Sequence, residues 1–164
     1  NKIQKLNFIC THNSRRSQLL QFWASFFSNY YNINCEVYSG GTVETEVHKS
    51  VLNNISDYCF NISFKECNNP IYSIKLKNQN LGNYFSKFYY NFENPKNEFA
   101  AIMTCSDAEN NCPVVEGSEI KFSLPYEDPK NYDTSKNDKN DYKKTSESIT
   151  SDMNYLLQTI TIKN

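Results

Sequence analysis

The start of the chain combines a short apolar run, a polar loop and a helical pattern, in that order. Residues 5–9 form the apolar run, residues 10–17 the loop, and from Gln18 onward apolar side chains recur at spacings of three and four. A buried strand followed by a loop and an amphipathic helix is the repeating unit of parallel sheets covered by helices. This unit constrains the fold more than any other feature of the chain, and it predicts an α/β protein.

The rest of the chain continues the alternation of strands and helices. Further strands are expected at 35–38, 70–76, 84–92, 99–104 and 120–123, and further helices at 44–54 and 149–160. Residues 105–113 and 131–144 are polar and are expected to be solvated loops. The Asn-rich middle, 57–96, has no assigned role. The pattern predicts a three-layer α/β/α fold with a central parallel sheet, and residues 1–164 fit one domain.

Composition narrows the class of protein. The net charge of -1 argues against nucleic acid as a partner, and no run of apolar residues is long enough to span a membrane. The first residues lack the apolar core of a secretory signal, so we expect a cytoplasmic enzyme, and Asn1 suggests that the natural chain starts slightly upstream. Six cysteines without a CxxC pair, and only two histidines, favour reactive thiols over disulfides or a metal site.

The loop between the first strand and the first helix has the form C-x5-R-S. Backbone N–H groups and the first helical turn would form an anion cradle there, and they favour a thiolate at Cys10 as nucleophile. Arg16 would clamp a tetrahedral oxyanion with two donors, and Ser17 would hydrogen-bond the thiolate. The simpler alternative is a buried cysteine beside a solvated arginine pair. The residues expected to bind the oxyanion are Thr11, His12, Asn13, Ser14, Arg15 and Arg16.

A candidate proton donor lies near residue 128. A cysteine mechanism that expels a basic leaving group needs a general acid, and Asp128 stands before a proline that stiffens its loop. Glu127 is a weaker candidate for the same role. The alternative reading is that Asp128 is an ordinary turn residue.

Two more cysteines bracket the segment that follows the strand at 99–104. If this segment and the Cys10 loop leave the same edge of the sheet, Cys105 could attack an adduct on Cys10, and Cys112 could resolve the resulting disulfide. From the residues alone, this thiol relay and a pair of inert thiols are equally well supported.

Together, Cys10 to Ser17, the Asp128–Pro129 pair and the segment CSDAENNCP (105–113) resemble thioredoxin-coupled arsenate reductases, which share the low-molecular-weight protein tyrosine phosphatase fold. The resemblance implies a three-thiol relay through Cys10, Cys105 and Cys112. It implies arsenate as substrate, thioredoxin or a similar thiol reductant as partner, and no organic or metal cofactor. It also allows a monovalent cation near Asn13 and Ser39. Arg15 departs from the family, which often has a second loop cysteine at that position.

Two other functions remain open. A low-molecular-weight protein tyrosine phosphatase acting on phosphate monoesters needs only Cys10, Arg16 and Asp128, with aromatic walls supplied by Tyr126, Tyr132 or the Tyr89–Tyr90 pair. A non-catalytic module that senses oxyanions or redox state is the other alternative, and the complete Cys10, Arg16 and Asp128 set argues against it.

Overall fold

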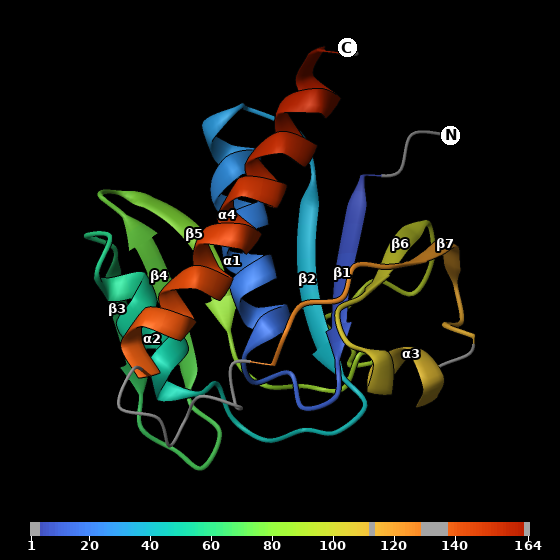
Figure 1. Cartoon of the computed structure of the whole chain (residues 1–164), viewed down its shortest axis with the longest axis horizontal. Coiled ribbons are helices and arrows are strands. Elements are labelled where there is room, and N and C mark those ends of the chain that lie inside the picture. Colours follow the sequence, from blue (N-terminus) through green and yellow to red (C-terminus); the bar gives the residue numbers. More distant parts are fainter. Residues whose placement is uncertain (1–3, 112–113, 129–137, 163–164) are drawn as a thin grey trace.

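A four-stranded parallel sheet forms the centre of the molecule (Figure 1). The computed structural model describes residues 4–111, 114–128 and 138–162. The spatial order of the strands is β2-β1-β6-β7. The strands span Lys5–Cys10 (β1), Glu36–Gly41 (β2), Phe99–Met103 (β6) and Ser118–Ser123 (β7). The chain therefore has the α/β architecture with a parallel sheet that its pattern predicted.

Helices cover both faces of this sheet. On one face α1 (Arg16–Tyr30) packs beside α4 (Asp138–Ile162), and α2 (Lys49–Ser56) lies against α4 (Figure 1). From the middle of α4 onward, the buried side chains repeat every four residues, which is the spacing of one helical face. They are Ile149, Met153 and Leu157. The short helix α3 (Ser106–Asn111) packs on the opposite face, where Ala108 joins a second core cluster with Cys10 and Met103.

A second, antiparallel sheet occupies much of the Asn-rich middle. Its strands are β3 (Asn61–Lys65), β4 (Ile71–Leu76) and β5 (Gln79–Tyr84), in that order. Ile74, Leu81 and Tyr84 bury their side chains in the core that also contains α1. The sheet stands to the left of the parallel sheet in Figure 1.

The predicted strand at 84–92 is wrong, and β3 was missed. The last strand of the antiparallel sheet ends at Tyr84, and residues 85–92 form a loop with one isolated bridge between Phe88 and Gly41. β5 has two asparagines and a glycine, which are depleted in strands, and β3 is only 5 residues long, so both give a weak signal. These strands form because they pair with β4 and pack against α1, which is tertiary information.

Three further expectations need correction. The helix expected at 44–54 begins at Lys49, because His48 caps it and residues 44–48 bond to the Cys10 loop instead. The segment 105–113 holds the helix α3 rather than only a loop. The segment 131–144 contains the start of α4, where Tyr142 is buried; residues 131–137 lie outside the described residues.

The topology places the chemistry at one edge. Strands β1 and β6 are neighbours and parallel, so the Cys10 loop and the Cys105 segment leave the same edge of the sheet. Within the described residues, no helix is long and apolar enough to cross a membrane.

Candidate active site

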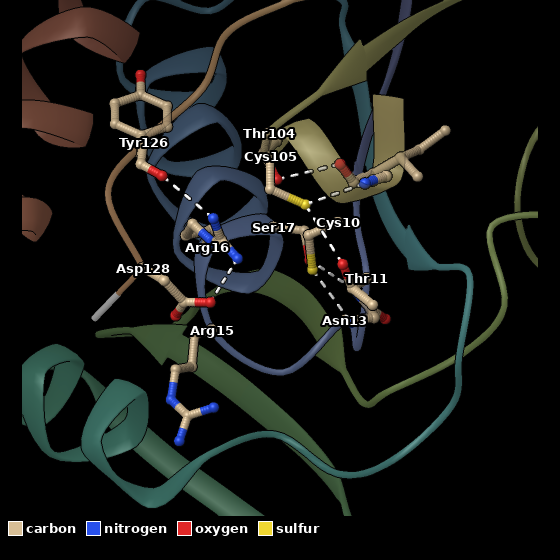
Figure 2. Close-up of polar contacts among 12 residues, drawn as sticks. Cys10, Thr11, Asn13, Arg15, Arg16, Ser17, Thr104, Cys105, Tyr126 and Asp128 are labelled. Atoms are coloured by element: carbon tan, nitrogen blue, oxygen red, sulfur yellow. Dashed lines mark hydrogen bonds and ion pairs between the residues drawn. The ribbon is translucent and has the colours of Figure 1, made fainter. Parts of the chain in front are cut away.

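The Cys10 sulfur lies inside the turn between β1 and α1, held by hydrogen bonds from that turn. The Asn13 N–H donates to Cys10 Sγ over 3.1 Å, and Ser17 Oγ lies 3.0 Å from the same sulfur (Figure 2). Cys10 is only 4% exposed. Two hydrogen-bonding groups, the Asn13 N–H and the Ser17 hydroxyl, therefore lie against the Cys10 sulfur.

Asn13 holds the loop in shape with its side chain. Its Oδ1 accepts from the Lys87 N–H, which fixes the amide so that Nδ2 donates to both Ser17 and Ser39. Because Ser17 already accepts from Asn13, its own proton is free to point at Cys10. Asn13 has a φ of 48°, a left-handed conformation that asparagine tolerates better than most residues. Asn13 therefore holds the loop in shape through its side chain.

A glycine at the end of β2 allows this turn to fold closely. A Cβ on Gly41 would lie 2.7 Å from the Thr11 carbonyl oxygen and 2.8 Å from the Asn13 nitrogen. Both contacts are shorter than real Cβ atoms make with backbone, so a side chain here would push the loop outward.

Arg16 and Asp128 meet although 112 positions separate them. Arg16 Nη2 lies 2.6 Å from Asp128 Oδ2, and Arg16 Nη1 donates to the Tyr126 carbonyl oxygen over 3.1 Å (Figure 2). Arg16 is 12% exposed and Asp128 35% exposed by side chain. The arginine still has donors left for a ligand, because its planar fork carries five N–H groups.

One pocket brings most of the predicted site together. It is open to solvent, and its lining residues are Cys10, His12, Ser14, Arg15, Arg16 and Asp128. The side chains of Cys10, Arg16 and Asp128 therefore face a common space. The Thr11 and Asn13 side chains bond elsewhere, Thr11 to Cys105 and Asn13 behind the loop. Backbone N–H groups and Arg16 are thus the main donors available to an oxyanion.

The Arg15 guanidinium turns away from Cys10 (Figure 2). Its Nε donates to the Tyr142 hydroxyl over 2.6 Å, and that hydroxyl lies 3.3 Å from His48 Nδ1. Arg15 therefore ties the pocket to the starts of α2 and α4. The Arg15 side chain thus holds these elements together and also adds positive charge at the pocket opening.

Cys105 is buried one hydrogen bond away from the Cys10 loop. Its sulfur lies 3.5 Å from Thr11 Oγ1, and the Ala108 N–H in α3 donates to it over 3.4 Å. Thr104 fastens the strand before it, because its N–H and its hydroxyl both donate to the Ile9 carbonyl. The two cysteine segments are therefore in contact through Thr11.

Four cysteines besides Cys10 and Cys105 remain to be placed. Cys10, Cys35, Cys59, Cys67 and Cys105 are all free thiols. Burial raises the pKa of Cys35 to about 11, so it stays protonated. Cys59 and Cys67 are exposed and do not line the pocket. Cys112, the predicted resolving thiol, lies outside the described residues.

The position allowed for a monovalent cation does not fit one. Asn13 presents its NH₂ group to Ser39, and the Ser39 hydroxyl donates to Gln21 Oε1, so these groups satisfy one another. A cation would need oxygen ligands there. Among the described residues, no group of three or more His, Cys, Asp or Glu side chains is placed to hold a metal ion.

Sequence reasoning missed several residues that support the site. Lys87 fixes Asn13 through its backbone, and Tyr126 holds Arg16 through its carbonyl oxygen. Tyr142 and His48 hold Arg15. Backbone donors and acceptors leave no residue-type signal, so only Tyr126 could have been found, by its place two residues before Asp128.

Comparisons with known proteins agree with this geometry. No protein-family model matches the chain. In sequence, the chain is similar to arsenate reductase 2 of Staphylococcus haemolyticus (strain JCSC1435), with 27% identity over 122 residues that cover 74% of this chain and 76% of the relative.

In structure, the chain is similar to members of two enzyme classes. A thioredoxin-dependent arsenate reductase of Corynebacterium glutamicum superposes with a TM-score of 0.58 at 19% identity; the match covers 100% of this chain, which spans 65% of that one. A low-molecular-weight protein tyrosine phosphatase from T. tengcongensis superposes with a TM-score of 0.67 at 16% identity and covers 94% of this chain and 98% of the other. With its C-x5-R-S loop, the chain therefore has the fold shared by low-molecular-weight protein tyrosine phosphatases and thioredoxin-coupled arsenate reductases, which confirms the resemblance inferred from its motifs.

Proposed function

We propose that this protein reduces arsenate to arsenite through a thiol relay that starts at Cys10. The observation that carries the proposal is the second buried thiol: Cys105 lies one hydrogen bond from the Cys10 loop, through Thr11. A phosphate-ester hydrolase has no use for a second thiol there, because water completes its cycle. A reductase needs one, because two electrons must reach the arsenic atom.

The first step forms an adduct on Cys10. The thiolate attacks arsenic, a sulfur–arsenic bond forms, and one oxygen of arsenate leaves as water after Asp128 supplies a proton. Loop N–H groups and Arg16 hold the remaining oxygens. Asp128 and Arg16 are in contact at 2.6 Å, so the proton donor and the anion clamp stand at the same side of the pocket.

The second step transfers the electrons. The Cys105 thiolate attacks Cys10 Sγ and a disulfide forms; the electron pair of the broken sulfur–arsenic bond stays on arsenic, which leaves as arsenite. Cys112 then attacks Cys105, Cys10 is released as a thiol, and a Cys105–Cys112 disulfide remains. A dithiol reductant of the thioredoxin type reduces that disulfide and becomes oxidised itself. No organic or metal cofactor takes part in these steps.

The pocket supports a small inorganic oxyanion over an aryl phosphate. In the described part of the chain, no Phe, Tyr or Trp side chain lines it. The Tyr126 hydroxyl points to Asp152 on α4, and Tyr89 packs against the core cluster that contains Cys10. Tyr132 lies outside the described residues. Hydrolysis of phosphate monoesters remains the second candidate, because the Arg16–Asp128 contact beside Cys10 would serve it equally well.

The test is arsenate-dependent oxidation of NADPH, coupled through thioredoxin and thioredoxin reductase. Wild type should turn over, Cys105→Ala and Cys112→Ala should fall to background, and the matched control Cys67→Ala, an exposed thiol outside the pocket, should keep wild-type activity. Hydrolysis of 4-nitrophenyl phosphate by the same variants separates the candidates. If wild type reduces no arsenate and hydrolyses the ester equally well in all variants, the protein is a phosphatase.

A further inference from the structure

Tyr126 connects three parts of the site at once. Its N–H donates to the Thr104 carbonyl oxygen, directly before Cys105, over 3.3 Å. Its carbonyl oxygen accepts from Arg16 over 3.1 Å, and its side-chain hydroxyl donates to Asp152 Oδ2 on α4 over 2.8 Å. Burial and the hydrogen bond to Asp152 hold the pKa of Tyr126 well above its usual range, so the hydroxyl keeps its proton and remains the donor.

The loop that carries Asp128 is tied to two helices, to α1 through Arg16 and to α4 through the Tyr126 hydroxyl. Upstream, the Leu124 N–H donates to the Met103 carbonyl, so the loop continues from the sheet as far as Tyr126. Asp128 follows two residues later and is held by Arg16. An incoming oxyanion would share the Arg16 guanidinium with this loop, whereas the Tyr126 hydroxyl holds the loop to α4 by a contact that does not involve Arg16.

We propose that Tyr126 and Asp152 form a positioning pair, which holds the Asp128 loop against α4 so that the acid stays over Cys10 when Arg16 turns to the substrate. The proposal rests on the proposed function only for the roles of Cys10, Arg16 and Asp128, which the reductase and phosphatase candidates share. The Tyr126 side chain does not line the pocket, so the pair would act indirectly, through the position of Asp128.

The first experiment measures kcat with two phosphate esters in Tyr126→Phe. This change removes the hydroxyl and keeps the ring, which packs against the main core. We expect kcat for phenyl phosphate, whose leaving group needs a proton, to fall about five-fold, the worth of one net hydrogen bond. 4-Nitrophenyl phosphate, with its better leaving group, should lose less than about two-fold. Equal losses of kcat with both esters, or no loss with either, would overturn the proposal that Tyr126 and Asp152 form a positioning pair.

A matched control separates positioning from stability. Tyr31 also donates its hydroxyl to α4, to Asn154 Oδ1 over 2.6 Å, on the α1 side of the helix. Tyr31→Phe should lower the melting temperature about as much as Tyr126→Phe and leave the ratio of the two kcat values unchanged. If Tyr31→Phe changes this ratio as Tyr126→Phe does, the effect is general loosening of α4 and the proposal falls.

Two variants test whether the effect passes through Asp128. Asp152→Asn keeps an acceptor oxygen and should restore most of the activity that Asp152→Ala loses. In an Asp128→Asn background, Tyr126→Phe should cause no further loss, because the group that it positions is already gone. Additive losses in the double variant would contradict the proposal.

Hydrogen exchange tests the anchor without any turnover. The Leu124 and Tyr126 amides are hydrogen-bonded donors, and they should exchange about five-fold faster in Tyr126→Phe and at the wild-type rate in Tyr31→Phe. If the wild type neither reduces arsenate nor hydrolyses either ester, the proposed function fails. Hydrogen exchange still tests whether the Tyr126 hydroxyl anchors the loop. Unchanged exchange in Tyr126→Phe would overturn it.

Discussion

Cys10 and Cys105 are both buried and lie at the ends of neighbouring strands, yet their surroundings differ. Cys10 ends β1 and is followed by a wide turn that wraps around its sulfur, with donors from Asn13 and Ser17. Cys105 follows β6, and α3 begins at the next residue, so its sulfur receives the Ala108 N–H at 3.4 Å and contacts Thr11.

The difference lies in the length of the turn. The turn between Cys10 and Arg16 lines an open pocket together with Asp128. The short turn at Cys105 leaves a thiol at a helix N-terminus with no arginine in its segment. Neighbouring strands of one sheet thus place one cysteine in an open pocket beside an arginine and the other directly before a short helix.

The largest effect should come from removing each sulfur in turn. Cys10→Ser should reduce both arsenate reduction and 4-nitrophenyl phosphate hydrolysis to background, because serine is not ionised in this cradle. Cys105→Ser should abolish arsenate reduction alone. Steady-state kinetics with both substrates would check this, and ester hydrolysis lost in Cys105→Ser would remove the contrast between the two thiols.

The next effect concerns the stiffness of the Cys10 turn. Asn13→Ala removes the bonds to Ser17, Ser39 and the Lys87 N–H, and it places alanine at a φ of 48°. We expect the free energy of unfolding to fall by about 3 kcal/mol in urea titrations. Asn32→Ala is the control, because exposed Asn32 has a φ of 52°. It should lose only about 1 kcal/mol. Equal losses would assign the whole effect to backbone strain.

A smaller effect should separate the anion site from the second thiol. Inorganic phosphate should protect Cys10 from alkylation by iodoacetate and leave Cys105 unprotected, as read from labelled peptides by mass spectrometry. Arg16→Ala should raise the phosphate concentration needed for half protection roughly ten- to hundred-fold, because charge-assisted hydrogen bonds are lost. For Arg16→Lys, the phosphate concentration needed for half protection should lie between those of wild type and Arg16→Ala. Phosphate protection of Cys105 equal to that of Cys10 would contradict the comparison.

The smallest effect concerns Lys87 behind the Cys10 turn. Burial lowers the pKa of Lys87 to about 8, and its ammonium lies 4.4 Å from the centre of the Phe85 ring. The folded-state pKa is below the unfolded value, so the cost of the charge is present below about pH 8 and disappears as the pH rises toward 10.5. Lys87→Met should therefore be more stable than wild type by about 2 kcal/mol at pH 7.

Urea titrations of both proteins across this range would check the Lys87 prediction. The difference in unfolding free energy should shrink steadily as the pH rises, since wild type loses the buried charge and the variant never had it. A difference that stays constant with pH would mean that Lys87 is not buried as a charged group.

The sequence determined the parallel sheet, the Cys10 turn and the pairing of a nucleophile with an arginine, because each depends on local order: an apolar strand, a loop of fixed spacing, then a helix. It also identified Asp128 and the Cys105 segment, whose residue types carry their chemistry. Those features needed no knowledge of distant contacts.

Only the tertiary structure decided the rest. In the antiparallel sheet β3 and β5 form by pairing with β4 and packing against α1, and neither strand has a strong local pattern. The backbone groups of Lys87 and Tyr126 that fix Asn13 and Arg16 carry no side-chain signal in a sequence. The direction of Arg15, toward Tyr142 and away from Cys10, depends on where α4 begins. A sequence alone does not predict such contacts, because they join residues far apart along the chain and many are made by backbone groups that all residues share.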